Sequence, residues 1–583
     1  MDDPTPTKRT TENHPSAFWL VAIGLLVLPL LVHAGSIGHP FLIDDHLAIA
    51  EHPQVTRFNG VFELWTSDYW ADRTEDANLY RPITVLSYWL NWWVTPDAPA
   101  GFRVINLLLL GGIGLVLVGL LKPRTGLAAA SIAAGVFVVH PVHGEVVNHI
   151  VSRADLLAAL GIVSFLALQA CALEHGWTKR RIVLAGLCTL VALGSKESGY
   201  ALLPLALVQW WVTARRQKTI DTAGPSEPSD PDSTPNPCGT DLGVCRKRAL
   251  LFSLLIPAAL LIGARLGVVG AGTVYLPGSD DLTGNPLRGL GLVERLPEAC
   301  AIFYWYLKQL VFPSLSFTQA PPPGGVGGWT VAAVVGGLLL LDCVIGSAWL
   351  ALSRKRHEVV LAPALLLFHF LIVGNLLLAT GVYAANRLTA ASTAAGAIAL
   401  GFGLAWVMRR SYRTRLAALI VGGGAVLVAG LTTVSHTGDW ADELARMQAD
   451  AEAQPDNPVA LYWLGQAYLQ AEQPARAIPA LQRSVALEPV PVQHRGALVR
   501  AYVFAGKDEE AWAAYERIRT LPGLDAQTRL CGAMAAFNLE DYDQARREAI
   551  RLPPDLAQQI LEPLDKLEPP HPSDEANPSR PGP

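Results

Sequence analysis

Residues 329–352 read W-T-V-A-A-V-V-G-G-L-L-L-L-D-C-V-I-G-S-A-W-L-A-L, an apolar run in which Asp342 is the one charged side chain. An α-helix rises about 1.5 Å per residue, so about 20 such residues cross the ~30 Å hydrocarbon layer of a bilayer. This stretch therefore predicts a transmembrane helix.

Similar runs recur along the chain of 583 residues, which is 51% hydrophobic and 16% charged, with a mean hydropathy of +0.30. That composition is not typical of a soluble globular protein. Because each run has roughly the length of a membrane span, we expect about eleven transmembrane helices. The predicted ranges are 17–36, 102–121, 126–142, 155–173, 181–194, 200–213, 249–270, 329–352, 358–378, 388–407 and 414–434.

The basic residues orient these spans, because loops kept in the cytoplasm are enriched in Lys and Arg. With the N-terminus inside, every strong basic cluster falls on the inner side of the alternating spans. The clusters are Lys8/Arg9, Lys122/Arg124, 179–181, Arg215/Arg216/Lys218, 246–248, 354–356 and Arg409/Arg410/Arg413/Arg415. An odd number of spans then places everything after residue 434 on the outer side.

Two segments leave this topology open. Residues 299–317 are aromatic and interrupted by Lys308 and Pro313, which indicates an interfacial or re-entrant segment. If this segment crossed the membrane, every later loop would lie on the opposite side from the one given above. The sequence V-H-A-G at 32–35 resembles a signal-peptide cleavage site, so a signal peptide is the alternative to the first span.

The C-terminal part of the chain differs from the rest. Residues 440–552 are polar, Ala-rich and repeat with a period of about 34 residues, as tetratricopeptide repeats do. We expect two good repeats and one degenerate repeat, whose concave groove suits an extended peptide. In this interpretation Tyr468 and Tyr502 belong to the groove that binds such a peptide. The first repeat matches the signature at Leu464, Gly465, Tyr468, Ala477, Leu481 and Pro489.

Together these patterns predict an all-α membrane protein with a C-terminal α-solenoid. The predicted parts are a cytoplasmic tail (1–16), a multi-span domain (17–438), a non-cytoplasmic repeat domain (439–552) and a disordered tail (553–583). Residues 219–245, rich in Pro, Ser and Asp, predict a disordered cytoplasmic linker.

Composition also excludes several classes of function. A net charge of −5 and an isoelectric point near 6.3 argue against binding to nucleic acid. The seven scattered cysteines include no C-x-x-C pair, so they indicate neither a zinc site nor a disulfide framework.

Ionisable residues gather in the predicted outer loops. Such groups beside a bilayer are costly unless they are paired or used, which makes them candidates for a site. The alternative for each is a solvated carboxylate, or a cation that reaches the headgroups. The residues are Asp44, Asp45, Arg81, His140, His143, Glu145, Arg153, Asp155, Lys196, Glu197, Arg288 and Arg387.

This inventory suits transfer of a sugar from a polyprenyl phosphate, whose phosphate lies in the headgroup layer. Asp44 or Asp45 would act as the base that takes the proton of the acceptor hydroxyl. Cations would stabilise the departing phosphate. We assign donor phosphate or sugar binding to Arg81, Arg153, Asp155, Lys196, Glu197, Arg288 and Arg387. We assign a supporting role in the outer loop to His140, His143 and Glu145.

Several motifs resemble the transmembrane-and-tetratricopeptide (TMTC) family. They are D-D-x-x-A-I at 44–49, Y-R-P-I-T-V-L-S at 80–87, F-R-V-I-N at 102–106, H-P-V-H-G-E-V-V-x-x-I-V-S-R-A-D-L-L at 140–157 and L-G-S-K-E-S-G at 193–199. The resemblance implies a GT-C-fold protein O-mannosyltransferase, distantly similar to the PMT enzymes. It implies inverting transfer of mannose from a lipid phosphate, with the base in the Asp44-Asp45 pair.

This chain departs from the family pattern where an A-E-R segment is replaced by Ala385-Asn386-Arg387, so no role is carried over for that glutamate. The expected partners are the lipid-linked donor, a protein or peptide acceptor held by the repeats, and membrane lipids. A divalent metal is left open, and no other cofactor is expected. The low Lys and high Arg and Ala content predicts a bacterial inner-membrane protein with its site and repeats in the periplasm.

Three other functions compete with protein glycosylation. They are a GT-C transferase acting on a glycan or lipid, a non-catalytic membrane-anchored repeat scaffold, and a transporter. The charges cluster at the outer surface and not at the bilayer midplane, which disfavours a transporter.

Overall fold

The computed structural model describes residues 15–42, 44–57, 60–71, 79–222, 247–270, 285–288, 290–313, 318–319, 328–353, 357–377, 379–487 and 490–567. The chain divides into two compact units, the first consisting mainly of residues up to Asp442 and the second beginning at Glu443. Within the described ranges both units are helical, and the one sheet is a pair of two-residue strands, β1 (Thr318–Gln319) and β2 (Ala384–Ala385).

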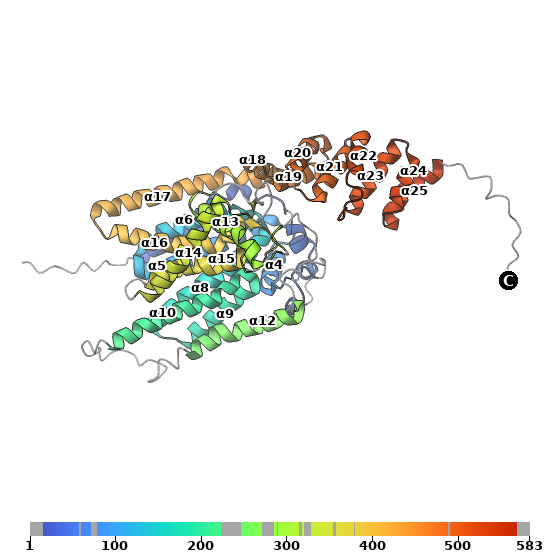
Figure 1. Cartoon of the computed structure of the whole chain (residues 1–583). Helices are drawn as coiled ribbons and strands as arrows, with labels where there is room; N and C mark the ends of the chain where they lie inside the picture. Colours follow the sequence, from blue (N-terminus) through green and yellow to red (C-terminus); the bar gives the residue numbers. More distant parts are fainter. Residues whose placement is uncertain are drawn as a thin grey trace, which may run out of the picture. The chain divides into compact units, whose positions relative to one another are not determined.

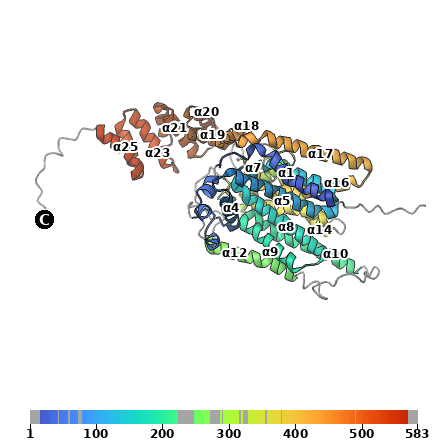
Figure 2. The same ribbon diagram turned by 180° about the vertical axis from the view of Figure 1, so that it is seen from behind.

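The first unit is a bundle of long apolar helices, drawn from blue through yellow and orange in Figures 1 and 2. Each predicted span overlaps one helix of this bundle. These helices are α1 (Pro15–Val32), α5 (Pro99–Thr125), α6 (Leu127–Val139), α8 (Arg153–His175), α9 (Lys179–Ser195), α10 (Leu202–Thr222), α12 (Ile256–Val269) preceded by η6 (Leu251–Leu255), α14 (Val331–Leu352), α15 (Leu361–Val373), α16 (Ala390–Met408) and α17 (Tyr412–Ser435).

Length and composition qualify 6 helices of the described ranges as membrane spans. They are 99–125, 150–175, 247–269, 331–352, 386–408 and 412–435. If the bent helix pair 127–139 and 141–148 counts as one span, the described ranges contain up to 7 candidate spans. Helices α1 and α15 are apolar but shorter. The exact number of crossings therefore stays a prediction.

Residues 299–311 of the segment 299–317 belong to a regular helix, α13 (Leu292–Val311), which packs along α14, and residues 314–317 lie outside the described residues. Its N-terminus is fixed by the Glu294 carboxylate, which accepts a hydrogen bond of 2.7 Å from the backbone N–H of Gly291. Ala299, Phe303 and Tyr306 recur at helical spacing and are buried. Phe303, Trp305 and Tyr306 thus pack inside the bundle, whereas Tyr304 and Phe312 are exposed.

The long segment between α1 and α5 contains η2 (His46–Ala50), α2 (Pro53–Thr56), α3 (Val61–Thr66) and α4 (Pro82–Val94). It has a small core of its own, in which Ile49, Tyr88 and Phe102 are fully buried. The buried Arg103 donates hydrogen bonds to the backbone carbonyls of His39 and Pro40, which fixes the start of this segment.

Short helices join the spans at the same end of the bundle. They are η3 (Pro141–His143), α7 (Gly144–Asn148), η4 (Ile150–Ser152), η5 (Glu197–Ala201) and η8 (Asn386–Thr389). At η5 a Cβ atom on Gly199 would lie 1.9 Å from the carbonyl oxygen of Ala192, so only glycine permits this close turn.

The last residues of the first unit lie at this end too. In η9 (Thr437–Trp440), Trp440 is buried, and its Nε1 lies 3.8 Å from where a Cβ on Gly144 would stand. The hydroxyl of Thr433 donates a hydrogen bond of 2.8 Å to the carbonyl of Val139. The chain therefore leaves this unit beside α7.

The second unit begins with α18 (Glu443–Ala453) and continues as three helix pairs. The pairs are α19 (Pro458–Gln470) with α20 (Pro474–Ala486), α21 (Val492–Phe504) with α22 (Asp508–Glu516), and α23 (Ala526–Asn538) with α24 (Tyr542–Ala549). In the first pair a Cβ on Gly465 would lie 2.4 Å from Leu481 Cγ, which shows how closely its helices pack. The third pair, expected to be degenerate, has both helices.

Two predicted disordered segments are partly helical, so these predictions were wrong in part. Residues 554–567 of the predicted tail form α25 (Pro554–Leu567), because Ala557, Ile560 and Leu564 make an apolar stripe that packs on α23 and α24. Helix α10 continues to Thr222, four residues into the predicted linker. The rest of that linker, the end of the tail from residue 568 and the N-terminal residues 1–14 lie outside the described residues.

Candidate active site

Two consecutive residues after α9, Lys196 and Glu197, each form an ion pair with a residue at the start of another helix. Lys196 Nζ, directly after α9, lies 2.5 Å from the Asp155 carboxylate in the first turn of α8. The next residue, Glu197, accepts a hydrogen bond of 2.7 Å from Arg81 at the start of α4. Arg265 of α12 lies 3.6 Å from the other oxygen of Glu197.

A third ion pair links the loop after α6 to the start of α16. The Glu145 carboxylate of α7 is 1% exposed and accepts from both the side chain and the backbone of Arg387, at 2.7 and 2.8 Å. The Arg387 guanidinium is 20% exposed, so this pair reaches from the protein interior towards solvent. Asn386 accepts a hydrogen bond of 2.6 Å from Gln309 of α13, which braces the same turn.

The three pairs form one electrostatic cluster. The charges of Arg81 and Arg387 both act on Lys196, and the charges of Glu145, Asp44 and Asp155 act on Arg387. Burial lowers the pKa of Lys196; Asp155 opposes this shift, and Arg81 and Arg387 add to it. Lys196, Arg81, Arg387 and Arg265 outnumber their paired carboxylates by one, so an additional anion would be attracted to the cluster.

The adjacent residues Asp44 and Asp45 have different surroundings. The Asp44 side chain is 45% exposed and lies 3.8 Å from His149 Nε2. Asp45 is fully buried and accepts hydrogen bonds from the backbone N–H groups of Leu42, Ile150 and Val151 at 2.9–3.3 Å. Burial raises the pKa of Asp45 to about 7, which these N–H donors oppose. Asp45 therefore holds two loops together, whereas Asp44 is accessible.

Arg153 does not join the cluster of ion pairs. It is fully buried and donates to the side-chain oxygens of Asn106 and Asn91, both at 2.7 Å, and to the carbonyls of Ser87 and Phe102. These bonds use four of the five N–H groups of its guanidinium. Arg153 is therefore placed to fasten α4 and α5 to α8.

The other predicted outer-loop residues also have protein partners. His140 faces the carbonyl of Leu310 at 3.3 Å, and His143 faces the hydroxyl of Thr393 at 3.3 Å, both within the bundle. Arg288 donates to the carbonyl of Gly381 at 3.3 Å. In the second unit, the hydroxyls of Tyr468 and Tyr502 accept hydrogen bonds from Gln448 and Gln482 at 3.1 and 2.8 Å.

Sequence reasoning missed Arg265, His149 and Tyr306. Arg265 lies within the predicted span 249–270, and a charged residue inside an apolar run is itself a signal of function. His149 stands in the H-P-V-H-G-E motif loop but was not singled out. Tyr306 gave no separate signal, because its segment was interpreted as interfacial. Among the described residues, no group of three or more His, Cys, Asp or Glu side chains is arranged to hold a metal ion.

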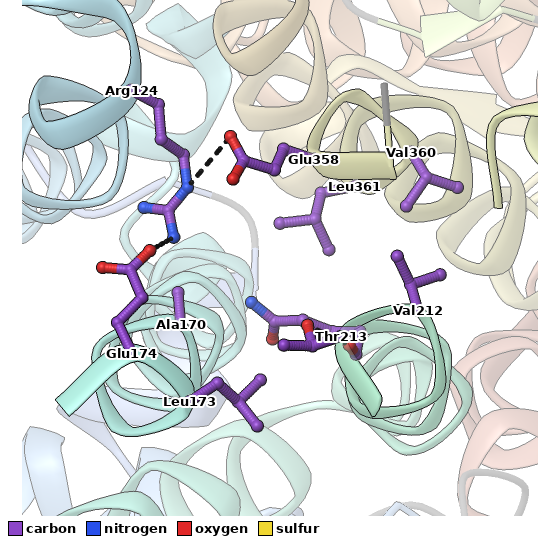
Figure 3. Close-up of a pocket in the computed structure, with 10 residues that line it drawn as sticks. Arg124, Ala170, Leu173, Glu174, Val212, Thr213, Glu358, Val360 and Leu361 are labelled. Carbon is purple, nitrogen blue, oxygen red and sulfur yellow. Dashed lines mark hydrogen bonds and ion pairs between the residues drawn. The ribbon is translucent and has the colours of Figure 1, made fainter. Parts of the chain in front are cut away.

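A separate cavity of about 50 Å³ lies near the opposite end of α8, lined by Arg124, Glu174 and Glu358 among others. Nineteen residues separate Asp155 from Glu174 on α8, which is about 28 Å along a helix. Figure 3 shows Arg124 between the two carboxylates, with Nε 3.6 Å from Glu358 and a closer contact to Glu174. The predicted site residues do not line this cavity.

No protein-family model matches the chain. Protein O-mannosyl-transferase TMTC4 of Mus musculus is 27% identical over 77% of this chain and 64% of its own length. TMTC3 of the same species is 21% identical over 89% and 59%, and TMTC1 is 37% identical over 24% and 16%. The homologues of this chain are TMTC-family protein O-mannosyl-transferases.

The chain thus spans just under two thirds of the length of TMTC4 and TMTC3. Among solved structures, it is similar to the crystal structure of ArnT from Cupriavidus metallidurans bound to undecaprenyl phosphate. That similarity has a TM-score of 0.38 and 14% sequence identity, and covers 87% of this chain and 81% of ArnT.

Proposed function

We propose that this TMTC homologue is an inverting GT-C-type glycosyltransferase that moves a sugar from a polyprenyl phosphate to a Ser or Thr hydroxyl of a protein. The carrying observation is the cluster of Lys196, Arg387 and Arg81 at one end of the apolar bundle, together with the accessible carboxylate of Asp44. The names of the homologues favour mannose as the sugar.

In the proposed reaction the acceptor hydroxyl oxygen attacks the anomeric carbon of the sugar from the face opposite the phosphate. The bond between that carbon and the phosphate oxygen breaks, and its electron pair stays on the phosphate. Asp44 takes the hydroxyl proton as general base. Its 45% exposure and its influence on Arg387 support this role.

The cations would act on the phosphate. Negative charge grows on its oxygens as the bond breaks, and prearranged cations stabilise such charge in a site with little water. Lys196 and Arg387 already have carboxylate partners, Asp155 and Glu145, which hold them in place before the donor binds. These steps use the positive charge that the chain itself supplies, and a divalent metal is left open.

We further propose that the repeats, including Tyr468 and Tyr502, bind the acceptor outside the cytoplasm. The chain leaves the first unit beside α7, which carries Glu145, and this supports placing the second unit on the same side of the membrane as the site. The composition supports a bacterial inner-membrane protein whose site faces the periplasm.

The test is sugar release from polyprenyl-phosphate mannose by the purified full chain in nanodiscs, with a Ser/Thr-rich protein as acceptor. Lys196→Ala should weaken donor affinity by about 10- to 100-fold, since a hydrogen bond to a charged group is worth about 1.5–3 kcal/mol. Lys308→Ala is the matched control, because Lys308 is exposed on α13, and it should bind donor as the wild type does. Failure of the wild type to release sugar from any polyprenyl-phosphate sugar would refute the proposal.

A further inference from the structure

Tyr306 of α13 has a buried hydroxyl that the protein leaves unused. Its side chain is 1% exposed, and its ring packs against Trp305 and Phe370 at centroid distances of 5.2 and 6.3 Å. Among the described residues, no acceptor takes the proton of this hydroxyl, although the backbone N–H of Ala385 acts on its oxygen as a donor. Most buried hydroxyls in proteins have a partner, because leaving one without a bond costs stability.

This hydroxyl lies near the ionic cluster, because Gln309 of the same helix is hydrogen-bonded to Asn386, the neighbour of Arg387. The charges of Glu145, Arg387 and Asp155 all act on it, and the backbone of Ala385 lies close to it. Both oxygens of Glu145 bind Arg387, and an oxygen of Asp155 binds Lys196, so the carboxylates are engaged elsewhere. Because neither carboxylate is bonded to Tyr306, the proton of its hydroxyl is available to an oxygen of a bound ligand.

We propose that Tyr306 is a donor-binding residue whose hydroxyl donates a hydrogen bond to a phosphate oxygen of the polyprenyl-phosphate donor. This inference rests on the proposed function. A phosphate held between Lys196 and Arg387 brings anionic oxygens into the region where the hydroxyl lacks an acceptor. That hydrogen bond strengthens as negative charge builds on the phosphate, so it favours the transition state as well as the bound donor.

Tyr383 shows what a structural tyrosine looks like in the same unit. It is also buried, but its hydroxyl donates a short hydrogen bond to the Glu298 carboxylate of α13. Removal of that hydroxyl leaves a buried carboxylate without its donor, which lowers stability. Removal of the Tyr306 hydroxyl leaves no carboxylate without its donor, because the hydroxyl proton has no acceptor among the described residues, and so its main effect should appear with ligand.

The experiment compares Tyr306→Phe, Tyr383→Phe and wild type as full chains in nanodiscs. Tyr306→Phe should lower single-turnover sugar transfer by about 10- to 100-fold, weaken undecaprenyl-phosphate binding about 10-fold, and melt at or above the wild-type temperature. Tyr383→Phe should melt at a lower temperature and bind undecaprenyl phosphate as the wild type does.

Undecaprenyl-phosphate binding separates this inference from the proposed function. If wild type binds the lipid but transfers no sugar, the proposed function fails, and a 10-fold loss of binding in Tyr306→Phe still supports the phosphate contact. Wild-type binding by Tyr306→Phe would overturn the inference, whatever the transfer rate. A drop in melting temperature equal to that of Tyr383→Phe would assign Tyr306 a structural role and overturn it too.

Discussion

The two units of this TMTC homologue form their buried polar contacts over different distances along the chain. In the membrane unit the ion pairs join residues 41, 116 and 242 positions apart, namely Asp155 with Lys196, Arg81 with Glu197, and Glu145 with Arg387. In the repeat unit the buried bonds Ser484–His494 and Tyr515–Glu548 join residues 10 and 33 positions apart.

This difference shows where each unit is vulnerable. A repeat contacts mainly its neighbours, so damage there should stay local. The ionic cluster draws on the ends of several helices, so it exists only when the whole bundle is assembled.

Asp44→Asn should lower sugar transfer by about 100- to 10,000-fold, because an amide cannot accept the hydroxyl proton. The melting temperature should stay close to that of wild type, since the Asp44 side chain is 45% exposed. Single-turnover transfer and thermal unfolding in nanodiscs measure the two effects. Asp45→Asn is the matched comparison, and it should lower the melting temperature more and the transfer rate less. Normal transfer by Asp44→Asn would exclude it as the base.

Glu145→Gln should destabilise the membrane unit by about 3–5 kcal/mol, because it leaves the Arg387 guanidinium without its buried partner. Thermal unfolding in detergent measures this change. Glu174→Gln is the control at the other end of α8, where the carboxylate is 41% exposed, and should cost less than about 1 kcal/mol. Equal effects of the two substitutions would contradict the idea that the cluster holds the bundle ends together.

Gly465→Val should destabilise the first helix pair of the repeat unit by about 1–3 kcal/mol, since its side chain would overlap Leu481. Hydrogen exchange should rise in residues 458–486 and remain unchanged in the membrane unit. Ala453→Val, at an exposed position of α18, serves as the control and should change exchange little. Faster exchange throughout the membrane unit would show that the two units unfold together.

The repeat unit should lose about 1 kcal/mol of stability between pH 7 and pH 5.5. Burial lowers the pKa of His494 from the ordinary 6.5 to about 4. Between these two pH values His494 is therefore protonated in the unfolded chain and neutral in the folded chain. Stability therefore falls with pH from about 6.5 to about 4. Hydrogen exchange in residues 490–504 measures the change, and His494→Gln should remove this part of the pH dependence. If the stability of His494→Gln still fell with pH as in the wild type, groups other than His494 would cause the pH dependence.

The sequence alone was sufficient to locate the long apolar helices and the period of about 34 residues in the C-terminal part. Apolar runs such as 329–352 form helices because a membrane-length segment must satisfy its own backbone hydrogen bonds. Gly465 and Leu481 stand at signature positions of the repeat, and their close contact lies within a single helix pair, so local sequence is enough to predict it. Helix α25 escaped prediction because its stripe of Ala557, Ile560 and Leu564 is short and is stabilised by packing on α23 and α24.

Only the tertiary structure decided how the charged residues are used. Asp44 and Asp45 are adjacent and chemically identical, but two of the three N–H groups that bond to Asp45 come from residues more than 100 positions away. Arg153 and Lys196 both looked like phosphate partners, yet the oxygens of Asn91 and Asn106 occupy Arg153, while Lys196 lies in the ionic cluster. Burial and pairing depend on which helix ends meet, and local sequence patterns do not encode such long-range contacts.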